Sequence, residues 1–230
     1  MLIECQNVSY GYPYAALPVF QHIDLQVADS GFHALFGASG VGKSTLARLL
    51  AGQLKAQNGE VRKAPGRTIL YSFNFERLPG WGSVAQHFQR VVPAANRKRL
   101  DDLVGTFGLH GCLEMRFSQL SLGQKNRVNL TRYLLQEFDL LIMDESLANV
   151  DEATREKIIL KIKTQFPQKC FLYISHSLVE VAKYAHQIFV LRGLGRTPQT
   201  TLLTGHDHRL STPVPKERLD RVMLELVRAA

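Results

Sequence analysis

A nine-residue stretch, Gly37–Thr45, has the residue types and spacing that bind phosphate groups. Its three glycines permit backbone angles that close main-chain N–H groups around an anion, and a helix beginning beside them would direct its positive dipole end at the same anion. The stretch therefore predicts a phosphate-binding loop, in which Lys43 bridges the β- and γ-phosphates of a nucleotide and the Ser44 hydroxyl binds Mg²⁺. The residues expected to contact the nucleotide here are Gly37, Ala38, Ser39, Gly40, Val41, Gly42, Lys43, Ser44 and Thr45.

Two neighbouring carboxylates, Asp144 and Glu145, are the second candidate for chemistry. They follow the apolar residues 140–143, which are typical of a buried parallel strand, and α/β proteins bind ligands at the carboxyl ends of such strands. Asp144 is suited to hold Mg²⁺ through its water shell, and Glu145 to accept a proton from the attacking water or to orient it. A solvated acidic turn is the alternative, and the phosphate-binding loop upstream favours the paired role.

A serine and a glycine, Ser121 and Gly123, stand at the start of a further helical pattern. Ser121 is a good helix N-cap, because its hydroxyl can accept a hydrogen bond from a main-chain N–H group of the first turn. The same helix end could also bind a second anion. The residues alone leave both interpretations open.

The hydrophobic pattern indicates which elements must position these residues. The apolar run 32–36 predicts a buried strand that feeds the loop, and residues 46–51 predict the helix that leaves it. Further strands are expected at 2–10, 19–27 and 67–73, and a turn at 57–60. The N-terminal part should therefore combine antiparallel strands with the parallel strand beneath the loop.

The residue pattern of the middle of the chain, residues 76–116, differs from that of the segments on either side, and we expect a helical insertion there. After it, strand and helix patterns alternate, which implies a mostly parallel sheet and an α/β fold. Helices are expected at 84–92, 96–107, 122–136, 153–165 and 178–185, and strands at 140–143, 170–174 and 188–191.

Near the C-terminus, one helical stripe consists of Leu219, Val222, Met223, Leu226 and Val227. We expect it to pack on the domain, with a partner's groove as the alternative. Residues 205–208, with two histidines and one aspartate, are interpreted as a solvated turn rather than a metal site.

The chain carries a net charge of +8 and has a pI near 9.5. Such a charge could attract nucleic acid or an anionic membrane surface. The densest basic cluster, 97–99, is short and has no interleaved aromatic residues, so a merely basic surface is expected and nucleic acid is an unlikely partner. No apolar run approaches the roughly 18 residues that a membrane-spanning helix needs.

The order and spacing of the motifs resemble those of the ATP-binding subunits of ABC (ATP-binding cassette) transporters over residues 2–204. The matching segments are the Walker A motif at 37–45, the signature motif at 120–124, the Walker B motif at 140–145, the end of the D-loop at 149–151 and the switch histidine His176. The resemblance implies a P-loop NTPase core of the RecA-like type, an N-terminal antiparallel β lobe and an α-helical subdomain. It implies one ABC ATPase domain over 1–230, with 1–74 and 136–210 as the core and β lobe, 75–135 as the helical subdomain, and 211–230 as a C-terminal helix.

The resemblance also implies roles for residues outside the loop. His176 would contact the γ-phosphate, and Tyr12 would stack on adenine, with core packing as the alternative for Tyr12. Asn74, in the Q-loop segment, would contact Mg²⁺ or the attacking water. The catalytic set is then Lys43, Glu145 and His176, and the metal set is Ser44, Asp144 and Asn74.

In this family two subunits sandwich two ATP molecules head to tail. The resemblance therefore implies a homodimer, or a heterodimer with a second ABC ATPase subunit. Ser121, Gly123 and Gln124 would face the nucleotide of the opposing chain, and Asp151 would join the nucleotide-binding set.

Three positions depart from the common family pattern. Leu122 replaces a glycine of the signature, Asn74 replaces the usual Q-loop glutamine, and Ser146 replaces the proline that commonly follows the second carboxylate. These departures bear on the rate of hydrolysis and on coupling rather than on nucleotide binding. Because Lys43, Asp144, Glu145 and His176 are all present, the site is interpreted as competent.

The function implied is hydrolysis of ATP with Mg²⁺ to energise solute transport through a separate integral membrane permease. The segment 77–84 looks most like the nitrate/sulfonate/taurine importer group, so a secreted solute-binding protein is a possible further partner. The subunit would lie at the cytoplasmic face of the inner membrane as a peripheral protein. The ATPase of a lipid or lipoprotein exporter is the nearest alternative. A soluble ABC ATPase acting on nucleic acid is a weaker one, since the sequence has no long coiled coil or large insertion.

Overall fold

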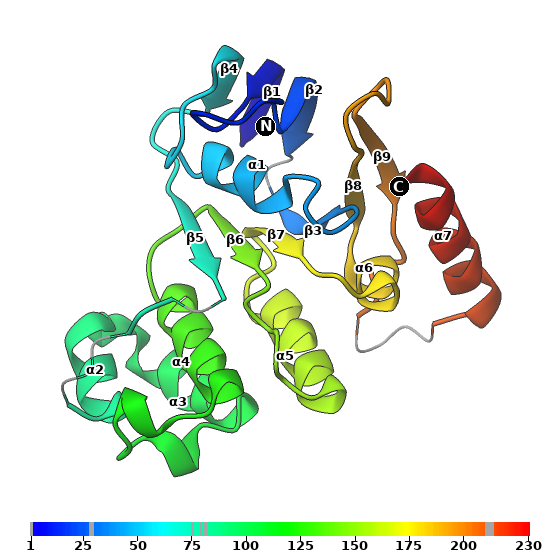
Figure 1. Ribbon diagram of the computed structural model, residues 1–230. Coiled ribbons are helices and arrows are strands. Elements are labelled where there is room, and N and C mark those ends of the chain that lie inside the picture. Colours follow the sequence, from blue (N-terminus) through cyan, green and yellow to red (C-terminus); the bar gives the residue numbers. More distant parts are fainter. Residues whose placement is uncertain (1, 28–29, 75, 79, 81, 210–213) are drawn as a thin grey trace.

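A six-stranded sheet in the order β5-β6-β7-β3-β8-β9 forms the centre of the computed structural model (Figure 1). Strands β5, β6, β7, β3 and β8 run parallel, and β9 pairs antiparallel with β8 at the edge. The strands are β3 (Gly31–Phe36), β5 (Ile69–Phe73), β6 (Leu140–Asp144), β7 (Cys170–Ile174), β8 (Gln187–Leu191) and β9 (Thr200–Thr204). The structure describes residues 2–27, 30–74, 76–78, 80, 82–209 and 214–230.

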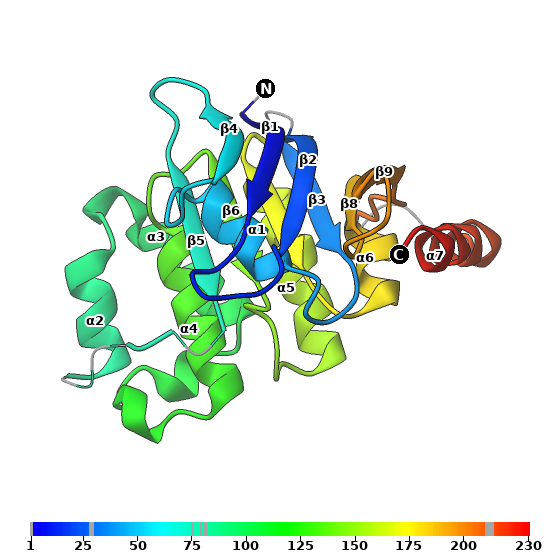
Figure 2. The same ribbon diagram turned by 45° about the horizontal axis from the view of Figure 1, so that its top comes forward.

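A second, antiparallel sheet of three strands covers the first helix. Its order is β2-β1-β4, with β1 (Ile3–Tyr10), β2 (Phe20–Val27) and β4 (Asn58–Lys63). Helix α1 (Lys43–Leu50) lies between the two sheets (Figures 1 and 2). Apolar side chains of β1, β2, α1 and one face of the central sheet form a single buried cluster, so the expected N-terminal β lobe is held to the core through α1.

The central strands are apolar on both faces because both faces are covered. Along β6, Leu140 and Ile142 belong to the cluster around α1, whereas Leu141 and Met143 belong to the cluster on the opposite side. Successive side chains of a strand point to opposite faces, so a continuous apolar run is what a doubly covered parallel strand requires. The α/β fold class is thereby confirmed.

Four helices gather on the side of the sheet opposite α1 (Figure 1). They are α2 (Val84–Val91), α3 (Arg97–Thr106), α4 (Leu122–Leu134) and α5 (Glu152–Gln165). Three short 3₁₀ turns connect them, η1 (Ala94–Asn96), η2 (His110–Cys112) and η3 (Phe117–Gln119). Their apolar side chains merge with those of β6 and β7 into one buried cluster. None of the helices that the structure describes combines the length and apolar character needed to cross a bilayer.

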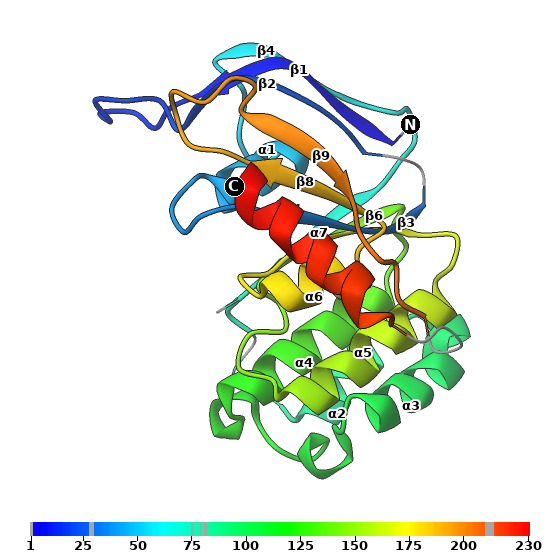
Figure 3. The ribbon, with the colours of Figure 1, turned by 90° about the vertical axis from the view of Figure 1, so that its right-hand side faces the viewer.

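The C-terminal helix α7 (Lys216–Ala229) packs against α6 (Leu178–Tyr184) and the β8–β9 edge (Figure 3). Val222 and Leu226 are buried in this contact, and Leu219 and Met223 are partly buried against it. The helical stripe therefore packs on the domain, as favoured from the sequence, except that Val227 is 62% exposed.

One turn was predicted wrongly and one strand was missed. The turn expected at 57–60 is largely strand, because β4 begins at Asn58 and Gly59 lies inside it. Gly59 adopts φ 75°, and a Cβ there would come within 2.2 Å of the Asn7 carbonyl oxygen, so this glycine permits an irregular, close pairing with β1. Strand β9 was not predicted at all, since its threonine-rich sequence lacks a clear alternation of buried and exposed positions.

The loop 205–208 is not the solvated turn that was expected. The ammonium group of Lys163, on α5, is buried and donates to Asp207 Oδ1 at 2.6 Å and to the His208 carbonyl oxygen at 2.7 Å. A buried ammonium needs acceptors, and this loop supplies them. Within the described residues no group of three or more His, Cys, Asp or Glu side chains is placed to hold a metal.

Candidate nucleotide-binding site

The phosphate-binding loop runs from the end of β3 to the start of α1, as the sequence predicts. Gly37 adopts φ 154°, and a Cβ there would come within 2.3 Å of the Leu191 carbonyl oxygen. Gly42 adopts φ 108° and directly precedes α1, where a Cβ would lie 2.5 Å from Val19 Cγ1. Side chains at these two positions would collide with β8 and with the segment before β2, so glycine is required for this loop path.

Lys43 folds back onto the loop that precedes it. Its Nζ donates to the carbonyl oxygens of Gly37 at 2.9 Å and Ala38 at 2.8 Å, and the residue is 6% exposed. Burial lowers the pKa of Lys43, and the nearby carboxylates Glu145 and Asp144 oppose that shift. The ammonium group and the positive end of the α1 dipole therefore lie at the same end of the loop, which suits a polyanionic ligand.

A cavity of about 520 Å³ opens where α1 meets the ends of β5 and β6, and its lining residues are Ser44, Arg48, Gln53, Tyr71, Phe73, Asn74, Asp144 and Glu145. Asp144 is the last residue of β6 and is 5% exposed. The Ser44 hydroxyl and the Asp144 carboxylate are hard oxygen donors of the kind that Mg²⁺ accepts. Two protein oxygens at the edge of a phosphate-binding loop fit a metal that takes its remaining ligands from phosphate and water.

Glu145 and His176 lie in direct contact at the rim of the site. His176 Nε2 lies 2.5 Å from Glu145 Oε1, and the two side chains are 52% and 35% exposed. Glu145 adopts φ 51°, and its main-chain N–H donates to the Ile174 carbonyl oxygen at the end of β7. This backbone path brings the two side chains, which come from different strand ends, together in a position open to water.

Tyr12 also reaches the loop region. Its hydroxyl is within hydrogen-bond distance of Thr45 Oγ1, at 3.1 Å, and its ring meets Tyr10 edge-to-face with centroids 5.2 Å apart. The residue is 40% exposed. Tyr12 is therefore not a core residue, and its partly open ring lies beside α1.

Asn74 is hydrogen-bonded to a residue of α4. Its Oδ1 accepts a hydrogen bond from Asn126 Nδ2 at 3.0 Å, and the same nitrogen donates to the Ala148 carbonyl oxygen at 2.9 Å. The main-chain N–H of Asn74 donates to the Asp144 carbonyl oxygen. Asn74 thus lines the cavity while its side-chain oxygen connects β5 to α4.

The start of α4 has a complete capping box. The Gln124 main-chain N–H donates to Ser121 Oγ at 3.2 Å, and the Ser121 N–H donates to Gln124 Oε1 at 2.8 Å. Leu122 is the first residue of the helix, so it has the helical conformation that a leucine tolerates well. A Cβ on Gly123 would lie 2.3 Å from the Asn149 carbonyl oxygen, so the glycine permits close approach of α4 to this chain's own loop after β6.

Asp151 caps the neighbouring helix. Its Oδ1 accepts a hydrogen bond from the Thr154 main-chain N–H at 2.9 Å, and this bond lowers the pKa of the Asp151 carboxyl. The residue is exposed at the N-terminus of α5. Its place in the nucleotide-binding set remains a prediction, because within one chain its carboxylate serves as an N-cap.

Sequence reasoning missed several residues that support the site. Tyr71 donates to Asp144 Oδ2 at 2.7 Å, and only its place in the strand before Asn74 could have pointed to it. Behind His176, the buried Glu180 accepts from Tyr173 at 2.7 Å and from Ser175 at 3.0 Å, and it also pairs with an arginine of α5. Because these partners lie on different elements, no local motif indicates the contacts.

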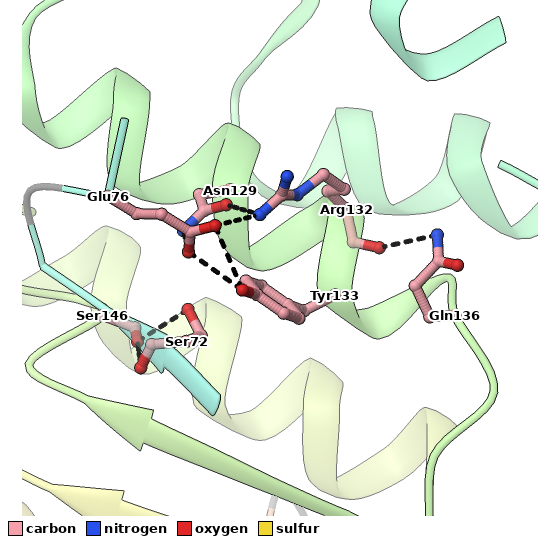
Figure 4. Close-up of polar contacts among 7 residues, drawn as sticks. All are labelled: Ser72, Glu76, Asn129, Arg132, Tyr133, Gln136 and Ser146. Carbon is pink, nitrogen blue, oxygen red and sulfur yellow. Dashed lines mark hydrogen bonds and ion pairs between the residues drawn. The ribbon is translucent and has the colours of Figure 1, made fainter. Parts of the chain in front are cut away.

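Two further contacts tie β5 and its continuation to their surroundings (Figure 4). Ser146 occupies the position after Glu145 where the family commonly has proline. It donates to the Ser72 carbonyl oxygen and lies 3.0 Å from Ser72 Oγ. Glu76 accepts hydrogen bonds from Asn129 at 2.7 Å and from the Tyr133 hydroxyl, and it pairs with Arg132. The segment after Asn74 is therefore anchored on α4.

A loop between β3 and α1 with a buried lysine, beside carboxylates at the end of β6, defines a P-loop nucleotide-binding protein. Residues 20–148 match the ABC transporter family. The chain belongs to that family.

Curated relatives include the molybdenum import ATP-binding protein ModC of Saccharophagus degradans, 33% identical over 204 residues, which cover 80% of this chain and 56% of the relative. Another is the aliphatic sulfonates import ATP-binding protein SsuB 1 of Rhodococcus jostii, 30% identical over 85% of this chain and 82% of the relative. The chain spans between 51% and 62% of the length of the ModC relatives that it matches.

Solved structures show the same fold. One ATP-binding subunit of an ABC transporter superposes with a TM-score of 0.78 at 23% identity, covering 99% of this chain and 100% of that one. A dimeric ATP-binding cassette in a post-hydrolysis state, bound to ADP and Pi, gives a TM-score of 0.73 at 21% identity, covering 89% of this chain and all of that one. These likenesses confirm the predicted P-loop NTPase core.

Proposed function

We propose that this chain is an ATPase subunit that energises uptake of a solute through a separate membrane permease, with ATP as substrate and Mg²⁺ as cofactor. The observation that carries the proposal is the convergence of Lys43, Asp144 and the Glu145–His176 pair, from three strand ends, beside one glycine loop. Convergence of a cation, a metal-binding carboxylate and a base is what phosphoryl transfer to water requires.

In this proposal each residue of the site has a distinct role. Lys43 and the loop N–H groups neutralise and orient the phosphates, and Mg²⁺, held through Ser44 and Asp144, supplies further positive charge to them. Glu145 accepts the proton of the attacking water or orients it, and His176 contacts the γ-phosphate. Tyr12 stacks on adenine, which its 40% exposure and its place beside α1 support.

The active form in this proposal is a head-to-tail dimer, of two such chains or of this chain and a second ABC ATPase subunit. Ser121, Gly123, Gln124 and Asp151 of one chain then face the nucleotide of the other. The described start of α4 supports this, because its N-cap serine is exposed and its N–H groups begin a long helix. The subdomain limits proposed with it are 75–135 for the helical subdomain, 1–74 and 136–210 for the core, and 211–230 for the C-terminal helix, of which 211–213 lie outside the described residues.

Import is favoured over export because the relatives named above are both import subunits. The permease would supply the membrane-spanning part, and the chain would be peripheral at the cytoplasmic face of the inner membrane. A secreted solute-binding protein would be a further partner. An exporter ATPase is the alternative, and co-purification of the chain with its permease and binding protein would decide between them.

Replacement of Glu145 by glutamine tests the proposed reaction. Loss of a general base costs about 10²–10⁴-fold in rate, whereas the glutamine keeps the shape of the side chain and removes a negative charge beside the phosphates. Glu145→Gln should therefore bind ATP, hydrolyse it very slowly and accumulate as an ATP-bound dimer, detected by size-exclusion chromatography with Mg-ATP. Wild-type turnover in this variant would rule out the assigned role of Glu145.

A further inference from the structure

Tyr71 contacts the carboxylate that the proposed function assigns to the metal. Its hydroxyl donates to Asp144 Oδ2 at 2.7 Å, and the two residues are 9% and 5% exposed. Tyr71 also lines the cavity that contains Ser44 and Asp144. Tyr71 begins the Q-loop segment 71–76, but sequence reasoning assigned this tyrosine no role.

The ring of Tyr71 is held on two sides, so the hydroxyl has a fixed place. It stacks on Phe73, with centroids 5.4 Å apart and planes at 20°, and it packs in the buried cluster of α1 and β6. Strands β5 and β6 are paired in parallel, with Phe73 opposite Asp144. A tyrosine has only two side-chain torsions that place its ring, and packing on both sides leaves little freedom in either.

A nearly buried carboxylate with one oxygen fixed by a donor has a defined orientation. Hydrogen bonds to charged groups are stronger than those between neutral groups, so the phenol favours one carboxylate rotamer over others. Without the phenol, Asp144 can turn toward the Lys43 ammonium group, with which its carboxylate interacts electrostatically. The second carboxylate oxygen of Asp144, which does not accept from Tyr71, would then no longer point consistently toward the metal position.

We propose that Tyr71 is a positioning residue for Asp144: its hydroxyl fixes one carboxylate oxygen so that the other remains available to Mg²⁺ beside the Ser44 hydroxyl. The inference rests on the proposed function and deepens it. It assigns to a residue of β5 part of the metal affinity of the site. Partners that orient a metal-binding carboxylate typically contribute 10–100-fold to metal affinity.

The test measures metal binding directly rather than turnover. Mn²⁺ is titrated into protein loaded with a stoichiometric non-hydrolysable ATP analogue, and free Mn²⁺ is followed by electron paramagnetic resonance. Tyr71→Phe should weaken Mn²⁺ binding about tenfold, while its affinity for the analogue in EDTA stays at the wild-type value. In steady-state assays the Mg²⁺ concentration for half-maximal ATPase activity should rise by a similar factor.

Tyr133→Phe is the matched control. It removes another tyrosine hydroxyl that donates to a carboxylate, that of Glu76, outside the cavity. Its Mn²⁺ affinity should equal that of the wild type. Asp144→Asn gives the reference for full loss of the metal-binding carboxylate.

The outcomes separate this inference from the proposed function. If the wild type binds no nucleotide, the proposed function fails. If the wild type binds Mn²⁺ through the analogue, Asp144→Asn does not, and Tyr71→Phe matches the wild type, only the role of Tyr71 is overturned. An equal weakening in Tyr133→Phe would also overturn it. Should Tyr71→Phe not fold, Phe73→Leu removes the ring that holds the phenol, and wild-type Mn²⁺ affinity in that variant would overturn the inference.

Discussion

Asn74 is one methylene shorter than the glutamine common at its position, and this decides what its amide can reach. The difference retracts the amide by about 1.5 Å, one C–C bond, and a hydrogen bond weakens well before such an offset. The structure adds that Asn74 Oδ1 already accepts from Asn126, on α4. A loose contact with the metal or the attacking water is therefore expected.

We predict that Asn74→Gln raises ATPase activity in the absence of a permease several-fold, because the longer side chain can extend from β5 into the cavity. Phosphate release by the purified variant measures this. Asn58→Gln, at an exposed position of β4, is the control and should leave the rate unchanged. An unchanged or lower rate in Asn74→Gln would mean that the backbone around residue 74 already compensates for the shorter side chain.

Whether a site residue could be predicted from the sequence depends on how far its contact partners lie from it along the chain. Lys43 was predictable, because its partners at Gly37 and Ala38 lie within a few residues along the chain, and the loop glycines were predictable from their spacing in the motif. Asn126 and Tyr71 were not, since each acts on a residue more than 50 positions away through a specific strand or helix register. Ser146 was recognised as a departure, but its bond to Ser72 depends on the pairing of β5 with β6.

Among the elements, α4 is the one whose position matters most for the proposed dimer. Its first turn would face a second nucleotide, and Gly123 in that turn lies against the Asn149 carbonyl oxygen. Asn126, one turn later, joins Asn74 to the Ala148 carbonyl oxygen. The start of α4 is thus fixed against the strand that leads into the chain's own cavity and against the loop after β6.

We predict that Gly123→Ala displaces the start of α4, because its Cβ would lie 2.3 Å from a backbone oxygen. Overpacking of this kind costs about 1–3 kcal/mol, so the midpoint of urea unfolding should fall. ATP binding by the monomer should persist, while hydrolysis should fall by more than tenfold. Gly111→Ala is the control, since nothing lies within 4 Å of a Cβ there. Wild-type turnover in Gly123→Ala would show that α4 tolerates the shift.

Most elements were predictable because their apolar pattern is strong. The helix expected at 96–107 is α3 at Arg97–Thr106, and the strand expected at 140–143 is β6 at Leu140–Asp144. The misses have a common cause: β4 and β9 are edge strands, whose positions are mostly half-buried or exposed. These two edge strands lack both the continuous apolar run of the central strands and the regular alternation of β2, so backbone pairing rather than side-chain pattern defines them.

At the scale of the whole molecule, the two halves of the proposed site lie on different parts of one chain. The loop, Asp144 and Glu145 surround the cavity beside α1, whereas Ser121 caps a helix on the opposite side of the central sheet from α1. A second subunit placed head to tail would bring the Ser121 of one chain to the loop of the other. This arrangement predicts that damage to the two halves can be complemented between chains.

Two variants that are inactive alone should recover activity when mixed. Lys43→Ala should greatly weaken ATP binding and abolish hydrolysis, because the charge that neutralises the phosphates is lost. Ser121→Arg should bind ATP as a monomer but not close on it, since a bulky cation replaces the N-cap at the start of α4. In a mixed dimer one site combines an intact loop with an intact Ser121, and the other site loses both. When equal amounts are mixed at random, about half of the dimers are mixed, and each of these has one intact site of two. The activity is then about a quarter of the wild-type value if the sites work independently.

The measurement is phosphate release as the ratio of the two variants is varied at constant total protein, with a maximum expected near equal amounts. Each variant alone, at the same total concentration, sets the baseline. Mixing Lys43→Ala with Glu145→Gln is the control, because both changes affect the same half-site and every composite site then carries one lesion. Full activity of Ser121→Arg alone would show that the start of α4 does not serve a nucleotide. The absence of any recovery on mixing, with dimers present by size-exclusion chromatography, would contradict a site shared between two chains.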